Sequence, residues 1–239
     1  MLLCKIMNRS FKIIFLSAVF SLFNVAYVYA ITPAEELAAE DWFNDDSDLD
    51  SDEINEGELK FISPITDKRI LYSEAVLTIT EDSLETGMAG LQQCYRNLDP
   101  VPDMEVVFDY SNMKQLKITS IDNVSDAKVV GQSIQLLAVR PSGSVCISAQ
   151  VQVLEKNGEN SFVLSHGPYY RQFLDGYYPY HISVTIDFPE NKLKYVDISP
   201  APEPQFEVTQ QPGKVFFDTW FEGVLLVKIK FSGVQRDRR

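Results

Sequence analysis

Apolar and polar residues alternate along most of the chain after Gly57. In residues 145–153 every second side chain is apolar, and the residues between them are polar apart from Cys146. A period of two predicts a β-strand that buries one face against a core. Similar or shorter runs predict further strands over residues 116–121, 134–138, 180–188, 215–217 and 224–231.

Turn residues divide these runs at short intervals. Turn signals lie at Pro141-Ser142-Gly143, Asn157-Gly158, Pro189-Glu190-Asn191 and Pro212-Gly213. Asn157-Gly158 predicts a hairpin, and Glu222-Gly223 is expected to join the last two strands as a closing pair. The proline-rich residues 199–206 are typical of an extended connector. This spacing predicts an all-β fold, an antiparallel β-sandwich, with a single domain over residues 58–239.

Two segments carry helical signals. Residues 83–98 have apolar side chains at helical spacing, but Gly87 and Gly90 would each cost such a helix about 1 kcal/mol. A turn at Gly87 followed by a strand fits nearly as well, so both readings stay open, with the strand favoured in a β chain. Around residues 168–175 one short helix is expected, because Pro168 suits a first helical position and Gly176 suits the residue after a helix end.

The first thirty residues have the anatomy of a secretory signal peptide. Lys5, Arg9 and Lys12 precede an apolar run over residues 13–23, and Val28-Tyr29-Ala30 offers small residues at a cleavage site. The alternative is an uncleaved membrane anchor, but the run is shorter than the ~20 residues of a comfortable span. We therefore predict a periplasmic or secreted protein that is not an integral membrane protein after signal cleavage.

Residues 31–57 form an acidic segment that we predict to be a largely disordered N-terminal arm. Twelve acidic residues and no basic one lie between Glu35 and Glu58, although Thr32 and Pro33 could begin a short helix. Asp46, Asp48 and Asp50 have the spacing of a calcium loop, but Ser51 and Gly57 stand where that loop needs glycine and glutamate. Calcium, a basic partner and a plain linker remain alternatives for this arm.

Charge and cysteine content narrow the class of protein. The formal net charge of −13 and the scarcity of clustered Lys and Arg argue against nucleic acid as a partner. Cys4 lies in the predicted signal peptide, which leaves Cys94 and Cys146 as an even pair. In an exported chain that pair predicts a disulfide, and the alternative is two separate buried thiols.

Residues 165–183 hold both histidines of the chain and a cluster of aromatics. Such residues either form a recognition surface or fill a β-sandwich core. As a surface, its candidate binding residues are Tyr169, Tyr170, Arg171, Asp175, Tyr177, Tyr178, His166 and His181. Two histidines fifteen residues apart match no metal motif, so we expect no metal site and no cofactor. No G-x-S-x-G is present, which favours a non-catalytic protein but leaves an enzyme as an open alternative.

Two stretches of the sequence, "LQQCYRNLDPVP" and "GPYYRQFLDGYYP", resemble segments of exported β-rich proteins of Gram-negative bacteria with no assigned activity. The similarity covers most of the chain after the acidic segment. It implies a periplasmic location and carries over no functional residue. Together with the aromatic cluster, it predicts a non-catalytic binding or accessory protein of the cell envelope that recognises a partner protein or a glycan. The alternative is an envelope hydrolase of glycan or ester bonds that uses His181 or His166.

Overall fold

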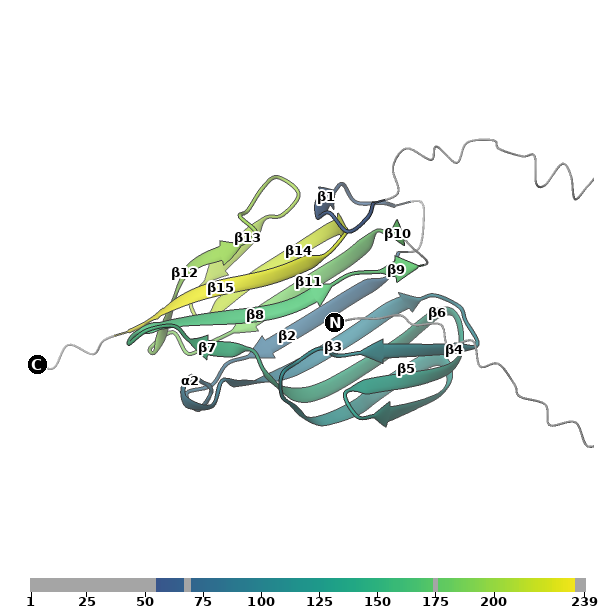
Figure 1. Ribbon diagram of the computed structural model, residues 1–239, viewed down its shortest axis with the longest axis horizontal. Coiled ribbons are helices and arrows are strands. Elements are labelled where there is room, and N and C mark those ends of the chain that lie inside the picture. The colour runs from purple at the N-terminus through teal and green to yellow at the C-terminus, as the bar shows by residue number, and fades with distance from the viewer. Residues whose placement is uncertain (1–54, 67–69, 174–175, 235–239) are drawn as a thin grey trace, which may run out of the picture. The chain divides into compact units, whose positions relative to one another are not determined.

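The computed structural model describes residues 55–66, 70–173 and 176–234, which belong to one compact unit. Its main sheet has nine strands (Figure 1). In spatial order these are β1 (Lys60–Ile62), β14 (Lys214–Glu222), β11 (Tyr180–Asp187), β2 (Tyr72–Thr78), β3 (Met88–Leu98), β6 (Ser133–Gln152) and β4 (Asp103–Val107), with β13 (Val208–Gln211) paired to β14 and β5 (Met113–Val130) paired to β6.

A second sheet of four strands completes the core. Its order is β12 (Leu193–Ser199), β15 (Leu225–Gly233), β8 (Ser161–Tyr169) and β7 (Leu154–Lys156). A two-stranded ribbon, β9 (Gln172–Phe173) with β10 (Gly176–Tyr177), and the short helix α2 (Ser83–Thr86) are the remaining elements among the described residues. Every strand pair in the described ranges is antiparallel except β2 with β11, which is parallel. The predicted all-β, sandwich-like fold is confirmed.

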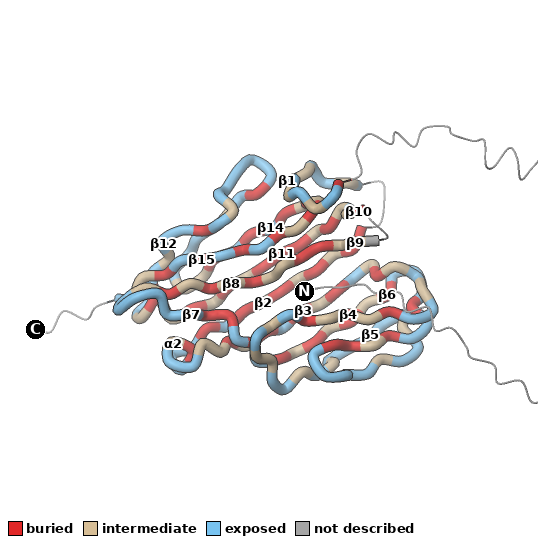
Figure 2. Tube along the Cα trace, viewed as in Figure 1, coloured by how far each residue is buried: buried red, intermediate tan, exposed pale blue. Residues whose placement is uncertain are grey.

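The alternation in the sequence sets which side of each strand is buried. In β11 the side chains of Tyr180, Ile182, Val184 and Ile186 are fully buried, whereas His181 and Thr185 on the other side are half-buried (Figure 2). The buried sides of both sheets contribute to one apolar cluster, in which Val184 of the main sheet joins residues such as Ile229 of the second sheet. Burying these large side chains is the main stabilising contribution to the fold.

Several predicted elements are confirmed. Residues 88–98 form strand β3, and Gly87 precedes it with a φ of +72°, a left-handed conformation that suits glycine. Asn157-Gly158 lies between the paired strands β7 and β8. The run over 134–138 and residues 145–152 of the second run belong to one long strand, β6, so Pro141-Ser142-Gly143 does not end a strand. The β5–β6 register shifts there instead.

Two further predictions are wrong. No helix forms near residues 168–173. Strand β8 continues to Tyr169, which pairs with Leu225 of β15 and packs against the buried Tyr180 ring. Gln172 and Phe173 then form β9. These long-range contacts override the local signals of Pro168 and Gly176. The closing pair is also wrong, because β14 and β15 are consecutive in the chain but lie in different sheets.

The crossing from β14 to β15 depends on a glycine. Gly223 has a φ of +82°, and a Cβ at this position would collide with the carbonyl group of Glu58. The chain therefore changes sheets where only glycine fits, rather than turning back within one sheet.

The disulfide is confirmed, and it joins neighbouring strands. Cys94 of β3 lies opposite Cys146 of β6, on the side of the sheet that faces away from the core.

The predicted signal peptide over residues 1–30, nearly all of the acidic arm and Asp175 lie outside the described residues. No helix in the described part of the chain is long and apolar enough to cross a membrane.

Candidate functional site

The side of the main sheet that faces away from the core carries one continuous row of large side chains. Trp220 of β14 lies opposite His181 of β11, His181 lies opposite Tyr72 of β2, and Tyr72 lies opposite Arg96 of β3. We call these four residues the cross-strand row. Directly opposite side chains on one side of a sheet are in contact, so strand register alone brings these residues together.

The rings of the row stack on one another. The Trp220 and His181 ring centroids are 4.3 Å apart with an interplanar angle of 12°, and those of His181 and Tyr72 are 4.4 Å apart at 31°. The Arg96 guanidinium lies over the Tyr72 ring, 5.5 Å from its centroid. An aromatic pair contributes about 0.5–1.5 kcal/mol beyond the area it buries, and an exposed cation–π contact about 0.5–1 kcal/mol.

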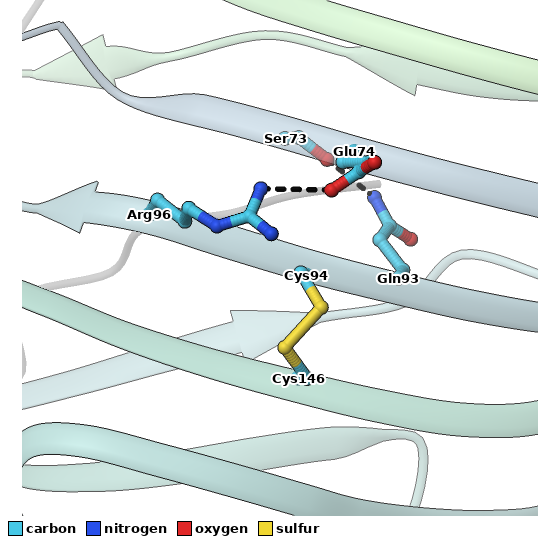
Figure 3. Close-up of a disulfide and its surroundings, with 6 residues drawn as sticks. All are labelled: Ser73, Glu74, Gln93, Cys94, Arg96 and Cys146. Carbon is cyan, nitrogen blue, oxygen red and sulfur yellow. Dashed lines mark hydrogen bonds and ion pairs between the residues drawn. A yellow bond between two sulfur atoms is a disulfide. The ribbon is translucent and has the colours of Figure 1, made fainter.

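The carboxylates of Glu74 and Asp218 flank the row and contact its polar groups. Arg96 donates from Nη1 to Glu74 Oε2 at 2.8 Å, and Figure 3 shows this contact reaching from β3 to β2 beside the Cys94–Cys146 disulfide. His181 Nε2 lies 2.9 Å from Asp218 Oδ1. Burial raises the pKa of Tyr72 above its usual value, so its hydroxyl stays protonated at neutral pH. The row and its two flanking carboxylates therefore place a cation, two anions and a neutral phenol side by side.

Stacking determines which part of each ring a ligand could contact. His181 is packed between Trp220 and Tyr72, and Tyr72 is packed between His181 and Arg96. The flat faces of these two rings are thus already occupied by neighbours. The polar groups of these rings lie at the ring edges, where His181 Nε2 contacts Asp218.

His166 was predicted as a candidate binding residue, but it lies in the core. Its side chain is 1% exposed; the Tyr110 hydroxyl lies 3.2 Å from Nδ1, and the Tyr169 hydroxyl contacts Nε2. A neutral imidazole satisfies both, since one ring nitrogen donates and the other accepts. Burial lowers the pKa of His166 from 6.5 to about 3, which keeps the ring neutral at physiological pH.

The other predicted residues divide between core and surface. Tyr169 and Tyr170 are buried, Tyr177 is half-buried against Tyr170, and Tyr178 is exposed. Arg171 forms an ion pair with Asp99 at 2.7 Å, and its guanidinium lies 5.7 Å from the Tyr178 ring centroid. The structure therefore brings Arg171 and Tyr178 together at the surface, whereas His181 belongs to the cross-strand row.

A histidine that acts in hydrolysis needs a nucleophile beside it, so the groups that surround His166 and His181 matter for this alternative. His166 contacts two tyrosine hydroxyls, and the only cavity described beside that cluster measures about 10 Å³, room for about one water molecule. His181 contacts Asp218, and Ser183 lies opposite Asp218 in the sheet. The described hydrogen-bond partners of the two rings include no serine or cysteine. Within the described ranges, no cluster of three or more His, Cys, Asp or Glu side chains could hold a metal ion.

A larger hollow lies on the other sheet. A groove of about 560 Å³ runs over the outer side of β7, β8, β15 and β12, where Lys156, Lys228 and Lys230 meet Glu155 and Asp197. Mixed charges line it, and it contains none of the predicted binding residues. None of the cavities described for this part of the chain is lined by a residue of the cross-strand row.

Three of the four residues of the row were not among the predicted binding residues. Tyr72, Arg96 and Trp220 are distant from His181 in sequence, and no local pattern shows which strands will be neighbours. One signal was visible: Trp220 occupies an outward position in a run whose inward positions include Phe217 and Phe221. A tryptophan on the polar side of a strand indicates a neighbour or a partner.

Comparisons with known proteins add no family to this description. No protein-family model matches the chain, and no curated protein matches its sequence.

Proposed function

We propose that this chain is an exported, non-catalytic binding protein of the bacterial cell envelope that recognises a partner protein through the cross-strand row. The observation that carries the proposal is the stacked set of Trp220, His181, Tyr72 and Arg96 on the outward side of the main sheet. Trp, Tyr and Arg are the side chains that most often dominate binding energy at protein interfaces. A preformed stack also loses little side-chain entropy when a partner binds.

The stacking favours a protein over a glycan. A sugar ring would need an open aromatic face, but neighbours in the row occupy both faces of His181 and of Tyr72. Trp220 at the end of the row stacks on His181 and lies opposite Ile62 of β1. Ring edges, an arginine and flanking carboxylates instead suit a polypeptide surface with its own hydrogen-bonding groups and charges. Glu74 and Asp218 would supply the charge selectivity of such an interface.

Export is the second part of the proposal. The signal-like first thirty residues support it, as does the disulfide, because disulfides persist in oxidising compartments. An envelope hydrolase is the second candidate, and the His181–Asp218 contact is the observation that favours it. The two candidates differ in what His181→Ala would do: a hydrolase would lose turnover, whereas a binding protein has none to lose.

Photocrosslinking in cells tests the proposed surface. A photoreactive residue at Gln92, exposed on the same side of β3 as Arg96, should capture a discrete partner protein. The matched position is Leu226, which is exposed on the outer side of the second sheet and should not capture it. Capture from Gln92 should be lost in the Trp220→Ala, Arg96→Ala double variant. Equal capture from both positions, or capture that survives the double variant, contradicts the proposal.

A further inference from the structure

The groove on the outer side of the second sheet has the size of a ligand site. It measures about 560 Å³ and lies over β7, β8, β15 and β12, which Figure 1 shows side by side. Ligand sites in proteins commonly have volumes of about 300–1,000 Å³ and combine apolar surface with a few polar groups. Strand register shows which polar groups line this groove and in what order they lie.

One row of the groove carries a lysine between two serines. Lys228 of β15 lies opposite Ser199 of β12 and opposite Ser165 of β8, on the side that faces away from the core. Lys228 is exposed and forms no ion pair with any residue that the structure describes. An ammonium group and two hydroxyl groups all donate hydrogen bonds. An oxygen anion above Lys228 thus finds three donors and no competing carboxylate in this row.

The next row along the strands carries both signs of charge. Lys230 lies opposite Asp197 and Val163, and Val163 lies opposite Glu155 of β7. Lys230 Nζ is 3.9 Å from Asp197 Oδ2, so these two charges offset each other. Glu155 is exposed and has no basic partner within the described ranges. The half-buried Val163 supplies apolar surface between the charges.

Two charges of opposite sign therefore stand apart in the groove without partners. Lys228 and Glu155 are two strands and two residues apart, which corresponds to about 12 Å between their Cα atoms. Lys156 also lines the groove, but it follows Glu155 in β7 and lies opposite the buried Phe162, so its side chain leaves the strand on the other side. The groove thus holds a cation and an anion on either side of an apolar residue.

We propose that this groove binds a short peptide of about three residues with free ends. The terminal carboxylate accepts hydrogen bonds from Lys228, Ser165 and Ser199, and the terminal ammonium group contacts Glu155. Three fully extended residues span about 10–11 Å, so the peptide bridges the two charges once the long side chains of Lys228 and Glu155 reach inward. The middle of the peptide lies over Val163, where small apolar side chains are accommodated best.

The same charges exclude other ligands. A single amino acid carries both of its charges on one carbon, so it reaches only one of the two groups. A polyanion is repelled by Glu155 and Asp197, which both line the groove. The groove lies on the second sheet and the cross-strand row on the main sheet, so the peptide site and the proposed partner surface stand or fall separately.

Titration of the purified protein with trialanine, followed by NMR, tests the site. Trialanine with free ends should bind, whereas its N-acetylated form and its C-terminal amide, each of which lacks one charge, should bind about tenfold more weakly or worse. Lys228→Gln and Glu155→Gln should each weaken the binding of trialanine by a similar factor. Lys228→Gln should not weaken the amide further, and Glu155→Gln should not weaken the N-acetylated form further, because in each case the lost charge has no partner.

Lys194→Gln is the matched control, since it removes an exposed lysine of the same sheet that does not line this groove and should leave trialanine binding unchanged. Circular dichroism verifies that each variant is folded. The proposal is overturned if trialanine does not bind at millimolar concentration, or if both blocked forms bind as well as the free peptide. Binding that survives in folded Lys228→Gln and Glu155→Gln, or that is lost equally in Lys194→Gln, overturns it as well.

Discussion

Acid should destabilise this fold through His166, whose ring is buried between Tyr110 and Tyr169. The perturbation is a change from pH 7 to pH 5. Burial lowers the pKa of His166 to about 3, whereas an unfolded histidine has a pKa of 6.5. Below pH 6.5 the unfolded chain thus binds a proton that the folded chain does not. The stabilising contribution is present above pH 6.5 and is lost progressively as the pH falls toward 3.

The size of the effect follows from the difference between the two pKa values. Each pH unit between them changes the free energy of unfolding by about 1.4 kcal/mol. From pH 7 to pH 5, His166 alone should therefore remove about 2 kcal/mol. That is a substantial share of the ~5–15 kcal/mol by which domains of this kind are stable.

Urea unfolding at pH 7 and at pH 5 measures this loss. Carboxylates also begin to titrate near pH 5, so the informative quantity is the difference between the wild type and His166→Gln, which lacks the ionisable ring. His181→Gln is the matched control, because it removes a partly exposed histidine and should leave the loss in place. An equal loss for the wild type and His166→Gln would refute the reasoning. If the Gln variant does not fold, NMR of the wild type decides, since the His166 ring signals should not titrate between pH 7 and 5.

Three further predictions concern the covalent and backbone features. Replacing Cys94 and Cys146 by Ala should lower the free energy of unfolding by up to about 4 kcal/mol, because the disulfide closes a loop with a sequence separation of 52; urea unfolding measures it, and no change would contradict the estimate. Gly87→Ala should lower the free energy of unfolding more than Gly131→Ala. Both glycines have a positive φ, which costs an alanine about 1–2 kcal/mol, but only at Gly87 would the new Cβ lie 2.6 Å from the Leu154 carbonyl oxygen. Thermal melts of the two variants compare them, and equal melting temperatures would count against the steric argument. N-terminal sequencing of the exported protein should begin at Ile31, and a sequence that begins before residue 13 would show that the signal-like segment is retained.

Local sequence pattern predicts the strands well and their neighbours poorly. The period of two over residues 145–153 identifies which side of β6 is buried, because side-chain direction is a local property of a strand. The turn from β14 to β15 shows the opposite case: Glu222-Gly223 is a valid turn signal, yet the strands it joins belong to different sheets. A turn signal does not say whether the chain turns within a sheet or crosses between two.

The same limit explains the candidate site. His181 was visible as a residue on the polar side of its strand, and the cysteine pair was visible from its number and context. The cross-strand row depends on the order β14-β11-β2-β3 and on the register of three strand pairs, one of them parallel. Those are set by the packing of the whole core, so Tyr72, Arg96 and Trp220 could not be grouped from one sequence. His166 carried the same local signals as His181 but occupies an inward position of β8.

The affinity of the captured partner for row variants tests the central claim most directly. Equilibrium binding should be measured for the wild type, Trp220→Ala, Arg96→Ala and the control Leu226→Ala. A buried hot-spot side chain contributes at least about 2 kcal/mol, so each row variant should bind about 30-fold more weakly or worse, and Leu226→Ala should bind like the wild type. Row variants that are folded and bind with unchanged affinity would show that the cross-strand row is not the binding surface.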